Sequence, residues 1–314
     1  MHHVAPLLRC PVTGEDLRIA SGGGAFVSGS GASYPFQDGV ACLLPPDEGP
    51  LQLAVMEFYE REGWAEANGR FGDTQRFVDT RPAPFRFTRA CIRRLGRHFR
   101  KGGACLLDAG CGPIAHEDLL DYGANFDRRV CVDLSAHALR ILQSKLGERG
   151  VYLQGDLSRL PLKNETVDAA LCYHVIYQLP YELQPLAFTE LWRVLKPGGV
   201  AVVVYWWQYA PLAHRIEMLA KALGLRGPGE EQTAVDASAV AHNVQSRDWF
   251  ESQPWPFAYS YDTYRVVTNR FMREYIPSDW RGGLFLRGVE MLQRAAPSFC
   301  GRYGVMPAIL IRKD

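Results

Sequence analysis

Two glycines and three carboxylates are spaced where they could hold a nucleoside. The stretch LLDAGCGPIAHEDLL closes an apolar run with Asp108 and then turns through Gly110 and Gly112. Glycine lets the backbone approach a ligand closely and adopt dihedrals closed to other residues. Asp133 ends the next apolar run, about 20 residues further on, where a carboxylate can accept hydrogen bonds from both ribose hydroxyls. Asp156, in QGDLSRLPL, ends a third run at the height of an adenine ring.

The same residues argue against a dinucleotide. A dinucleotide fingerprint would want a further glycine near position 115, where this chain has Ala115. Three carboxylates would repel a pyrophosphate, but they suit a nucleoside that carries an ammonium group and no phosphate. This combination points to S-adenosylmethionine. The glycine turn would face its amino-acid part, Asp133 its ribose and Asp156 its adenine amine.

The elements that must position these residues alternate between strand and helix from residue 104 onward. Strands are expected at ACLLDAG, RRVCVDLS, VYLQGDL, TVDAALCYHVIY and VAVVVYWW, and helices at HEDLLDYG, HALRILQSKLGERG and ELQPLAFTELWRVLKPGG. Near-continuous apolar strands that alternate with helices indicate a parallel sheet covered on both faces. We therefore predict an α/β fold with a doubly wound, mostly parallel, Rossmann-like sheet.

A family resemblance follows from these motifs. LLDAGCG, VCVDLS, GDLSRLPL, VDAALCYHVIYQLP and ELWRVLKPGGVAVVV, in this order, resemble the successive motifs of the class I S-adenosylmethionine-dependent methyltransferases, strongly over about residues 104–205. The resemblance implies a seven-stranded sheet whose last strand is antiparallel, in a domain over residues 104–314. The chain departs from the pattern at Pro113-Ile114-Ala115, where a third glycine is frequent. The cofactor-binding residues that it implies, with their neighbours, are Asp108, Gly110, Cys111, Gly112, Asp133, Leu134, Asp156, Leu157 and Tyr173.

The first part of the chain resembles a second family. Residues 1–46 are rich in glycine and turns and predict a small β module, followed by a helical linker or cap over 47–103. LLRCPVTGEDL and SYPFQDGVACLLP are similar to the zinc-ribbon-like module that serves as an activator subunit of tRNA and translation-factor methyltransferases. A tetrahedral zinc site needs about four ligands. Because only Cys10 and Cys42 remain here, we expect a metal-free remnant.

Methyl transfer is an in-line displacement that needs alignment, with a base only for weakly nucleophilic acceptors. The segment CYHVIYQLP follows the fourth strand, at the lip of the sheet where the methyl group would point. We predict His174 as a general base; the alternative is that it packs against the cofactor. Tyr177 is the second catalytic candidate and could instead only cover the sheet edge.

Aromatic side chains follow the fifth strand. They suit a planar or apolar acceptor, and the alternative is that they pack a helical cap onto the sheet. A substrate-cap insertion is expected over about 206–280, and some aromatic residues between Trp249 and Tyr264 are expected to face the substrate. The predicted substrate-binding residues are Tyr205, Trp206, Trp207 and His214.

Composition and charge limit the partners. With 47% hydrophobic residues, 22% charged residues and a net charge of +1, the 314-residue chain has no global field that selects a polyanion. The N-terminus has no long apolar run typical of a signal peptide, and no apolar run is long enough to span a bilayer. The eight cysteines show no paired spacing, so we expect reduced thiols and a cytoplasmic location. The basic run from Arg86 to Lys101 is either a solvated helix face or a guide for RNA phosphates.

These observations predict an S-adenosylmethionine-dependent methyltransferase that acts on a small-molecule or lipid-like acceptor in biosynthesis. The alternatives are an RNA (rRNA or tRNA) methyltransferase, supported by the N-terminal segment and the basic run, and a non-catalytic subunit that binds a partner protein. The three aligned carboxylates argue against the last. Oxygen, nitrogen and carbon stay open as the acceptor atom, as does a homodimer or partner contact through the N-terminal module.

Overall fold

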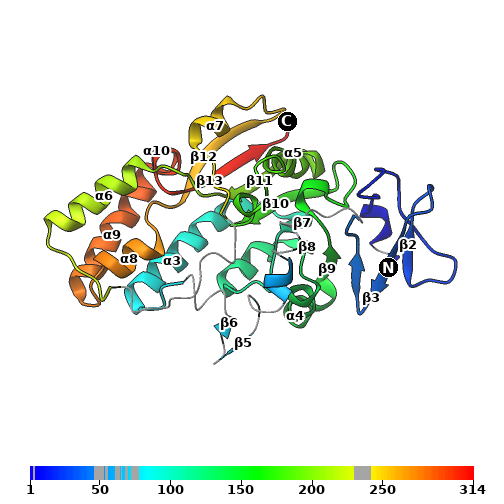
Figure 1. Cartoon of the computed structure of the whole chain (residues 1–314), viewed down its shortest axis with the longest axis horizontal. Helices are drawn as coiled ribbons and strands as arrows, with labels where there is room; N and C mark the ends of the chain where they lie inside the picture. Colours follow the sequence, from blue (N-terminus) through cyan, green and yellow to red (C-terminus); the bar gives the residue numbers. More distant parts are fainter. Residues whose placement is uncertain are drawn as a thin grey trace.

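The computed structural model describes residues 1–2, 4–45, 53, 56–60, 64, 66–67, 70–71, 78–229 and 242–314. Within these residues one large sheet runs through the molecule, with helices on both of its faces (Figure 1). Its eleven strands lie in the order β1 (Arg18–Ile19), β2 (Ala25–Val27), β3 (Ser33–Gln37), β4 (Val40–Cys42), β9 (Gly150–Gln154), β8 (Phe126–Asp133), β7 (Gly103–Ala109), β10 (Val167–Tyr173), β11 (Leu195–Val204), β13 (Met306–Arg312) and β12 (Ala258–Arg265). A separate pair joins β5 (Glu66–Ala67) and β6 (Arg70–Phe71).

The centre of the sheet is parallel. β9, β8, β7, β10 and β11 pair in parallel, and β13 is antiparallel to both β11 and β12. The predicted α/β fold with a mostly parallel sheet is thus confirmed. The predicted count of seven strands is wrong for the sheet as a whole, because the N-terminal strands extend its edge. The junction is β4, which pairs in parallel with β9 from Val40↔Tyr152 to Cys42↔Gln154.

Two apolar cores cover the two faces. Along β7, Cys105, Leu107 and Ala109 belong to one core and Leu106 to the other, as expected where successive side chains point to opposite faces. Helix α5 (Gln184–Val194) packs into the first core with the N-terminal segment. Helices α3 (Pro82–Leu95) and α4 (Ala136–Leu146) pack into the second. The basic helix also has an apolar side, whose residues Phe87, Cys91, Leu95 and Phe99 are all buried.

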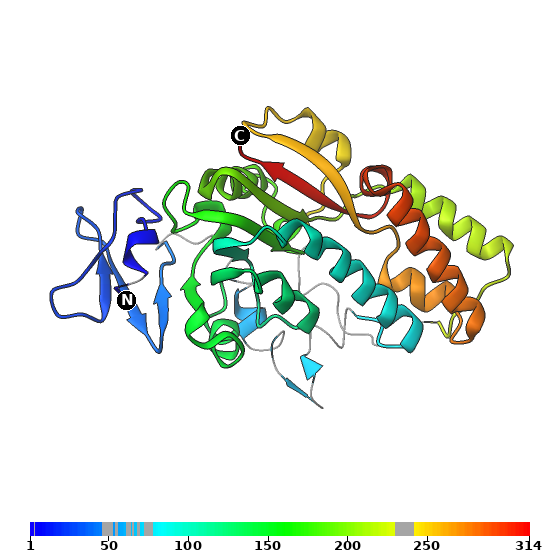
Figure 2. The ribbon, with the colours of Figure 1, turned by 180° about the vertical axis from the view of Figure 1, so that it is seen from behind.

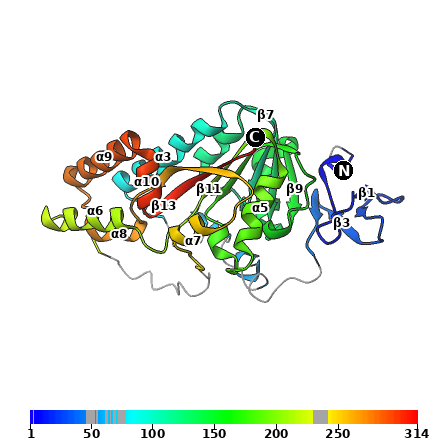
Figure 3. The ribbon, with the colours of Figure 1, turned by 90° about the horizontal axis from the view of Figure 1, so that it is seen from above.

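The region after β11 is mainly helical. It comprises α6 (Pro211–Ala222), α7 (Arg247–Ser252), β12, α8 (Asn269–Tyr275), α9 (Trp280–Ala295) and α10 (Pro297–Tyr303). Figures 2 and 3 show α6, α8 and α9 with the start of α3 at one end of the molecule and the N-terminal segment at the other. Part of the predicted cap insertion, residues 230–241, lies outside the described residues. So do residue 46 of the predicted β module and residues 47–52, 54–55, 61–63, 65, 68–69 and 72–77 of the predicted helical linker. No helix in the described ranges is both long and apolar enough to cross a membrane.

The N-terminal segment is bound to the rest of the chain by more than the β4–β9 pair. Leu8 forms an isolated bridge with Leu162, and both side chains are fully buried. Arg9 forms an ion pair with Glu190 of α5 at 3.1 Å. The apolar side chains of the segment belong to the same core as those of the central strands. Sheet and core therefore both continue across this boundary.

Because of this continuity, we expect Leu8→Ala to destabilise the whole chain by about 2–5 kcal/mol, the usual cost of truncating a buried leucine. Urea unfolding followed by tryptophan fluorescence and far-UV circular dichroism should give one shifted transition in which the two signals coincide. A separate early transition that alone responds to the substitution would show that the N-terminal segment folds as its own unit.

Candidate cofactor and acceptor site

The glycine turn lies at the carboxyl end of β7, the middle of the parallel strands. Gly110 and Gly112 both have left-handed backbone conformations, with φ of +72° and +50°. A Cβ on Gly112 would lie 2.8 Å from the ring of Trp64, and a Cβ on Gly110 would collide with Val175. Both positions therefore require glycine, for conformation and for space. Cys111, between them, has a thiol whose pKa is raised well above its ordinary value by burial.

Asp133, at the carboxyl end of β8, is joined to this turn. One carboxylate oxygen accepts from the backbone N–H of Gly112 at 2.7 Å and the other from that of Ser135 at 2.9 Å. Ser135 in turn caps α4 by accepting from Ala138 N–H at 3.0 Å. Burial raises the pKa of Asp133 to about 6. The carboxylate predicted to bind the ribose thus also fixes the shape of the glycine turn.

Asp108 is engaged by a residue that the sequence analysis missed. Its Oδ2 accepts from Nη2 and Nε of Arg129 at 2.6 and 3.0 Å, and both side chains are almost fully buried. Arg129 also donates to the carbonyl of Leu119, at 2.9 Å. The signal was present, because an arginine inside the apolar strand RRVCVDLS needs a carboxylate partner when buried.

Leu134 and Asp156 lie at the ends of the neighbouring strands β8 and β9. The carbonyl of Leu134 accepts from Gln154 Nε2 at 3.0 Å, which joins the two strand ends. Asp156 is 1% exposed and caps the 3₁₀ turn Leu157–Arg159, accepting from the backbone N–H of Ser158 at 2.9 Å and from its hydroxyl. Leu157 is buried in the same turn.

Two buried polar atoms beside this edge have no hydrogen-bond partner in the part of the chain that the structure describes: Trp64 Nε1 and His174 Nδ1. Trp64 lies against Gly112 and stacks on Tyr59, with ring centroids 5.0 Å apart. Glu60 accepts from His137 N–H at the start of α4, at 3.0 Å. A glycine cradle, a carboxylate at the ribose position and unpaired polar atoms fit the predicted nucleoside cofactor. Tyr59 and Trp64 are not among the site residues predicted from the sequence.

An aromatic cluster lies at the carboxyl ends of β10, β11 and β12. The ring of His174 is 4.4 Å from that of Tyr173 and 5.1 Å from that of Tyr264, measured between centroids. The hydroxyl groups of these two tyrosines are hydrogen-bonded at 2.5 Å. Tyr177 stacks on His242 at 5.7 Å. We use "aromatic cluster" for Tyr173, His174, Tyr177, Trp206, His242 and Tyr264.

His174 is held in an unusual state. Its φ of +64° lies in the left-handed region, which costs a residue with a side chain roughly 1–3 kcal/mol. Burial, together with the positive charge of Arg265, lowers the pKa of His174 well below its ordinary value. The imidazole is therefore neutral near pH 7, and its Nδ1 has no partner. Strain of this kind persists only where the surroundings fix the residue.

The structure separates the predicted substrate-binding residues. Trp206 joins the aromatic cluster, 5.9 Å from Tyr177 and 5.5 Å from His242. Tyr205 and Trp207 point to the opposite face and are fully buried. The hydroxyl of Tyr205 donates to Gln184 at 2.6 Å, and the indole N–H of Trp207 donates to the carbonyl of Gly301 at 3.2 Å. His214 is exposed on α6 and is not brought to the cluster.

The N-terminal segment contains two free cysteines, Cys10 and Cys42. Cys10 is buried with its Sγ 3.1 Å from the hydroxyl of Tyr34. Cys42 lies on β4 and has a pKa raised by burial. In the part of the chain that the structure describes, no three His, Cys, Asp or Glu residues lie together as a metal site would require.

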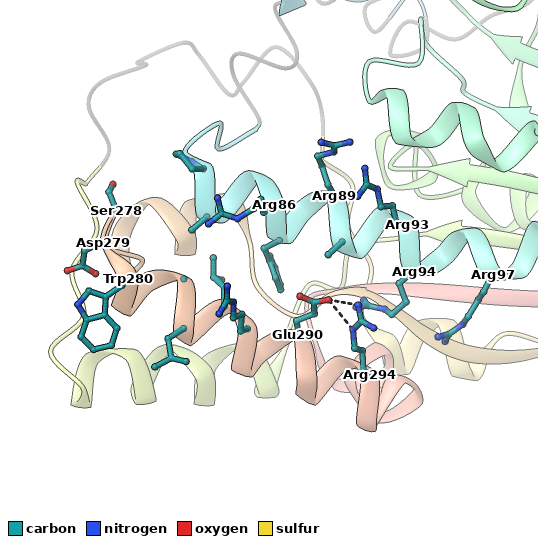
Figure 4. A pocket seen from close by; sticks show the side chains of 18 of the residues that line it. Arg86, Arg89, Arg93, Arg94, Arg97, Ser278, Asp279, Trp280, Glu290 and Arg294 are labelled. Atoms are coloured by element: carbon teal, nitrogen blue, oxygen red, sulfur yellow. Dashed lines mark hydrogen bonds and ion pairs between the residues drawn. The ribbon is translucent and has the colours of Figure 1, made fainter.

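The basic run lines a groove of about 1070 Å³ between α3 and α9 (Figure 4). Part of its charge is paired within the protein. Arg89 and Arg93 both bind Asp118, and Arg97 binds Asp262 at 2.6 Å. Across the groove, Arg294 is paired with Glu290 at 2.6 Å. This pairing reduces the charge that the groove could offer to RNA phosphates.

Residues 107–203 match the family model of a methyltransferase domain. A malonyl-[acyl-carrier protein] O-methyltransferase of Pectobacterium atrosepticum is 33% identical over 46% of this chain and 54% of its own length. A demethylmenaquinone methyltransferase of Protochlamydia amoebophila is 35% identical over 30% of this chain and 41% of its own length. A tRNA (carboxymethyluridine(34)-5-O)-methyltransferase of Arabidopsis thaliana is 33% identical over 33% of this chain and 24% of its own length.

Among solved structures, a geranyl diphosphate C-methyltransferase from Streptomyces coelicolor aligns with 85% of this chain and 98% of its own, at 16% identity and a TM-score of 0.47. The family model and the curated relatives identify residues 107–203 as a methyltransferase domain, and S-adenosylmethionine is the cofactor that this family implies. The chain spans about half the length of the curated relative from Pectobacterium, 54% of it.

Cofactor affinity should depend on pH through Asp133. Because its pKa is about 6, the carboxylate is ionised at pH 7.5 and becomes protonated as the pH falls through 6. Protonation removes the predicted acceptor for the ribose hydroxyls. We expect the dissociation constant for S-adenosylhomocysteine, measured by calorimetry, to rise up to tenfold per pH unit below about pH 6.

Two variants check this assignment. Asp133→Ala should abolish measurable binding with an unchanged circular dichroism spectrum, and Asp133→Asn should bind weakly with no pH dependence between 5 and 7.5. Normal affinity in Asp133→Ala would refute the ribose position.

Proposed function

We propose that this protein transfers a methyl group from S-adenosylmethionine to a small-molecule or lipid-like acceptor bound at the aromatic cluster. The observation that carries the proposal is His174, a strained, neutral imidazole with an unpaired nitrogen among the described residues. It is surrounded by aromatic rings, and the next residue, Val175, lies against Gly110 of the glycine turn. The two curated relatives named for malonyl-[acyl-carrier protein] and demethylmenaquinone support a non-nucleic-acid acceptor.

Each part of the site has a role in this proposal. Gly110, Gly112 and Asp133 would hold the cofactor, which supplies a methyl group activated by its sulfonium charge. The aromatic cluster would align the acceptor and exclude water, which accounts for most of what methyl transfer requires. His174 Nδ1 would accept the proton of a hydroxyl or amine acceptor, and Tyr177 would form the wall behind it.

RNA methylation is the weaker alternative. It is supported by the Arabidopsis relative and by the arginines of the groove. The pairing of Arg89, Arg93 and Arg97 with internal carboxylates opposes it. The third possibility, a non-catalytic partner-binding subunit, predicts no heat on titration with S-adenosylhomocysteine.

The decisive experiment incubates the purified protein with methyl-tritiated S-adenosylmethionine and cell extract, followed by separation into RNA, protein and small-molecule or lipid fractions. We expect label in the small-molecule or lipid fraction. Label in RNA would overturn the proposal and make the groove the substrate surface.

The role of His174 is tested by His174→Asn. Asparagine tolerates the left-handed backbone and keeps a hydrogen-bonding group, but it cannot take up a proton at neutral pH. We expect kcat to fall by about 10²–10⁴-fold, the range for loss of general base catalysis, with little change in KM for S-adenosylmethionine. Because the pKa of His174 is depressed in the protein without acceptor, kcat/KM for the acceptor should stay level from pH 8 to 6 where cofactor is saturating. Unchanged turnover in the variant at every pH would leave alignment as the whole mechanism.

A further inference from the structure

Arg265, the last residue of β12, is a buried cation that has no carboxylate partner among the described residues. It is 3% exposed. Its Nη1 donates to Thr88 Oγ1 at 3.3 Å and Asn269 Oδ1 at 2.9 Å, its Nη2 contacts Met306 Sδ at 3.4 Å, and its Nε has no partner. These partners are all uncharged. Arg129, equally buried in this chain, has the carboxylate of Asp108 at 2.6 Å. Burying a guanidinium without an opposite charge is unfavourable, so the difference between the two residues needs an explanation.

Arg265 adjoins the aromatic cluster. Its guanidinium carbon lies 5.4 Å from the ring centroid of Tyr264, and that ring is 5.1 Å from the ring of His174. Burial is the main cause of the lowered pKa of His174, and the positive charge of Arg265 is the second. The same two causes, in the same order, lower the pKa of His116 to about 4. This side of the cluster is therefore electropositive.

The carboxylate that acts on His116 does not neutralise this charge. Asp118 is held at 2.6 and 2.8 Å by Arg89 and Arg93, which lie on the α3 side. In the ranges the structure describes, Arg265 forms no ion pair with any carboxylate.

A second buried arginine lies next to it. Nη2 of Arg94, on α3, donates to the carbonyls of Thr263 and Tyr264, at 2.9 Å each. Its Nε and Nη1 are buried without a partner. Together with Nε of Arg265, these groups make a buried set of charged donors around the end of β12. Guanidinium donors of this kind are best satisfied by the oxygens of a carboxylate or a phosphate.

We propose that the methyl acceptor carries an oxyanion, a carboxylate or a phosphate, which Arg265 binds while the apolar remainder of the acceptor lies against the aromatic cluster. The inference rests on the proposed function and specifies its substrate class. Arg265 then sets specificity: an acceptor without the anion leaves the guanidinium uncompensated and binds weakly. The competing explanation is that Arg265 only ties β12 to α3 and α8 through Thr88 and Asn269.

The test uses three probes that share a phenyl ring for the cluster: phenylacetate, phenyl phosphate and the neutral phenylacetamide. Their affinities are measured by calorimetry with and without saturating S-adenosylhomocysteine. We expect the wild-type protein to bind one of the anions at least tenfold more tightly than the amide. A preference for phenyl phosphate would identify a phosphate-bearing acceptor, and a preference for phenylacetate a carboxylic acid.

Arg265→Met should remove this preference and leave affinity for phenylacetamide unchanged. Its melting temperature without ligand should equal or exceed that of the wild type, since an apolar side chain replaces an uncompensated buried charge. A purely structural arginine predicts a lower melting temperature instead. Arg265→Lys keeps the charge but loses the forked donors, so it should weaken anion binding and leave amide binding unaffected. This variant provides the test if Arg265→Met folds poorly. Arg287→Met, at an exposed arginine of α9, is the matched control and should keep the preference.

Equal binding of amide and anions by the wild type, or an intact preference in the Arg265 variants, would overturn the proposal. Its failure is distinguishable from failure of the proposed function. Absence of S-adenosylhomocysteine binding would contradict the methyltransferase activity, whereas the preference for an anion is measured without that ligand as well.

Discussion

The buried ion pair between Asp108 and Arg129 is the constraint on which the geometry of the site depends. It joins the end of β7 to β8, and through the carbonyl of Leu119 it holds the segment that follows the glycine turn. Removing one partner of such a pair costs about 3–5 kcal/mol, because the other charge stays buried. Asp108 also raises the pKa of Asp133, so an uncompensated Asp108 would weaken the carboxylate that anchors Gly112. The ion pair thus protects both the shape and the charge state of the predicted cofactor site.

Local patterns in the sequence were enough to predict the centre of the fold. Apolar runs followed by Gly110, Asp133 or Asp156 indicate parallel strands, and parallel strands bring their carboxyl ends to one edge. What could not be predicted depends on partners distant in the chain. The β4–β9 pair that extends the sheet joins residues more than a hundred positions apart. The aromatic segment that contains β12 was predicted as part of the substrate-cap insertion. It forms a strand because it pairs with β13, which lies further along the chain.

Side-chain direction explains the mixed outcome at the predicted acceptor site. Successive residues after β11 point to opposite faces, so Trp206 reaches the aromatic cluster while Tyr205 and Trp207 fill the core. The sequence shows that neighbours must point to opposite faces, but not which of them faces the site.

For the basic run as well, the sequence does not show which side chains are exposed. Composition gives the charge of α3, whereas only the fold shows that Asp118 and Asp262 neutralise part of it and that Arg94 is turned inward.

In the proposed mechanism, acceptor binding is coupled to the chemistry of His174 by electrostatics. Without a bound anion, Arg265 and burial keep the imidazole neutral, which leaves Nδ1 available but makes it a weak base. An oxyanion beside Arg265 would cancel the contribution of the guanidinium and raise the pKa of His174 back toward its ordinary value. The base would then gain strength only when an acceptor of the right charge is in place. A neutral molecule that entered the aromatic cluster would meet a histidine too weakly basic to accept its proton, so discrimination would arise in the rate as well as in binding.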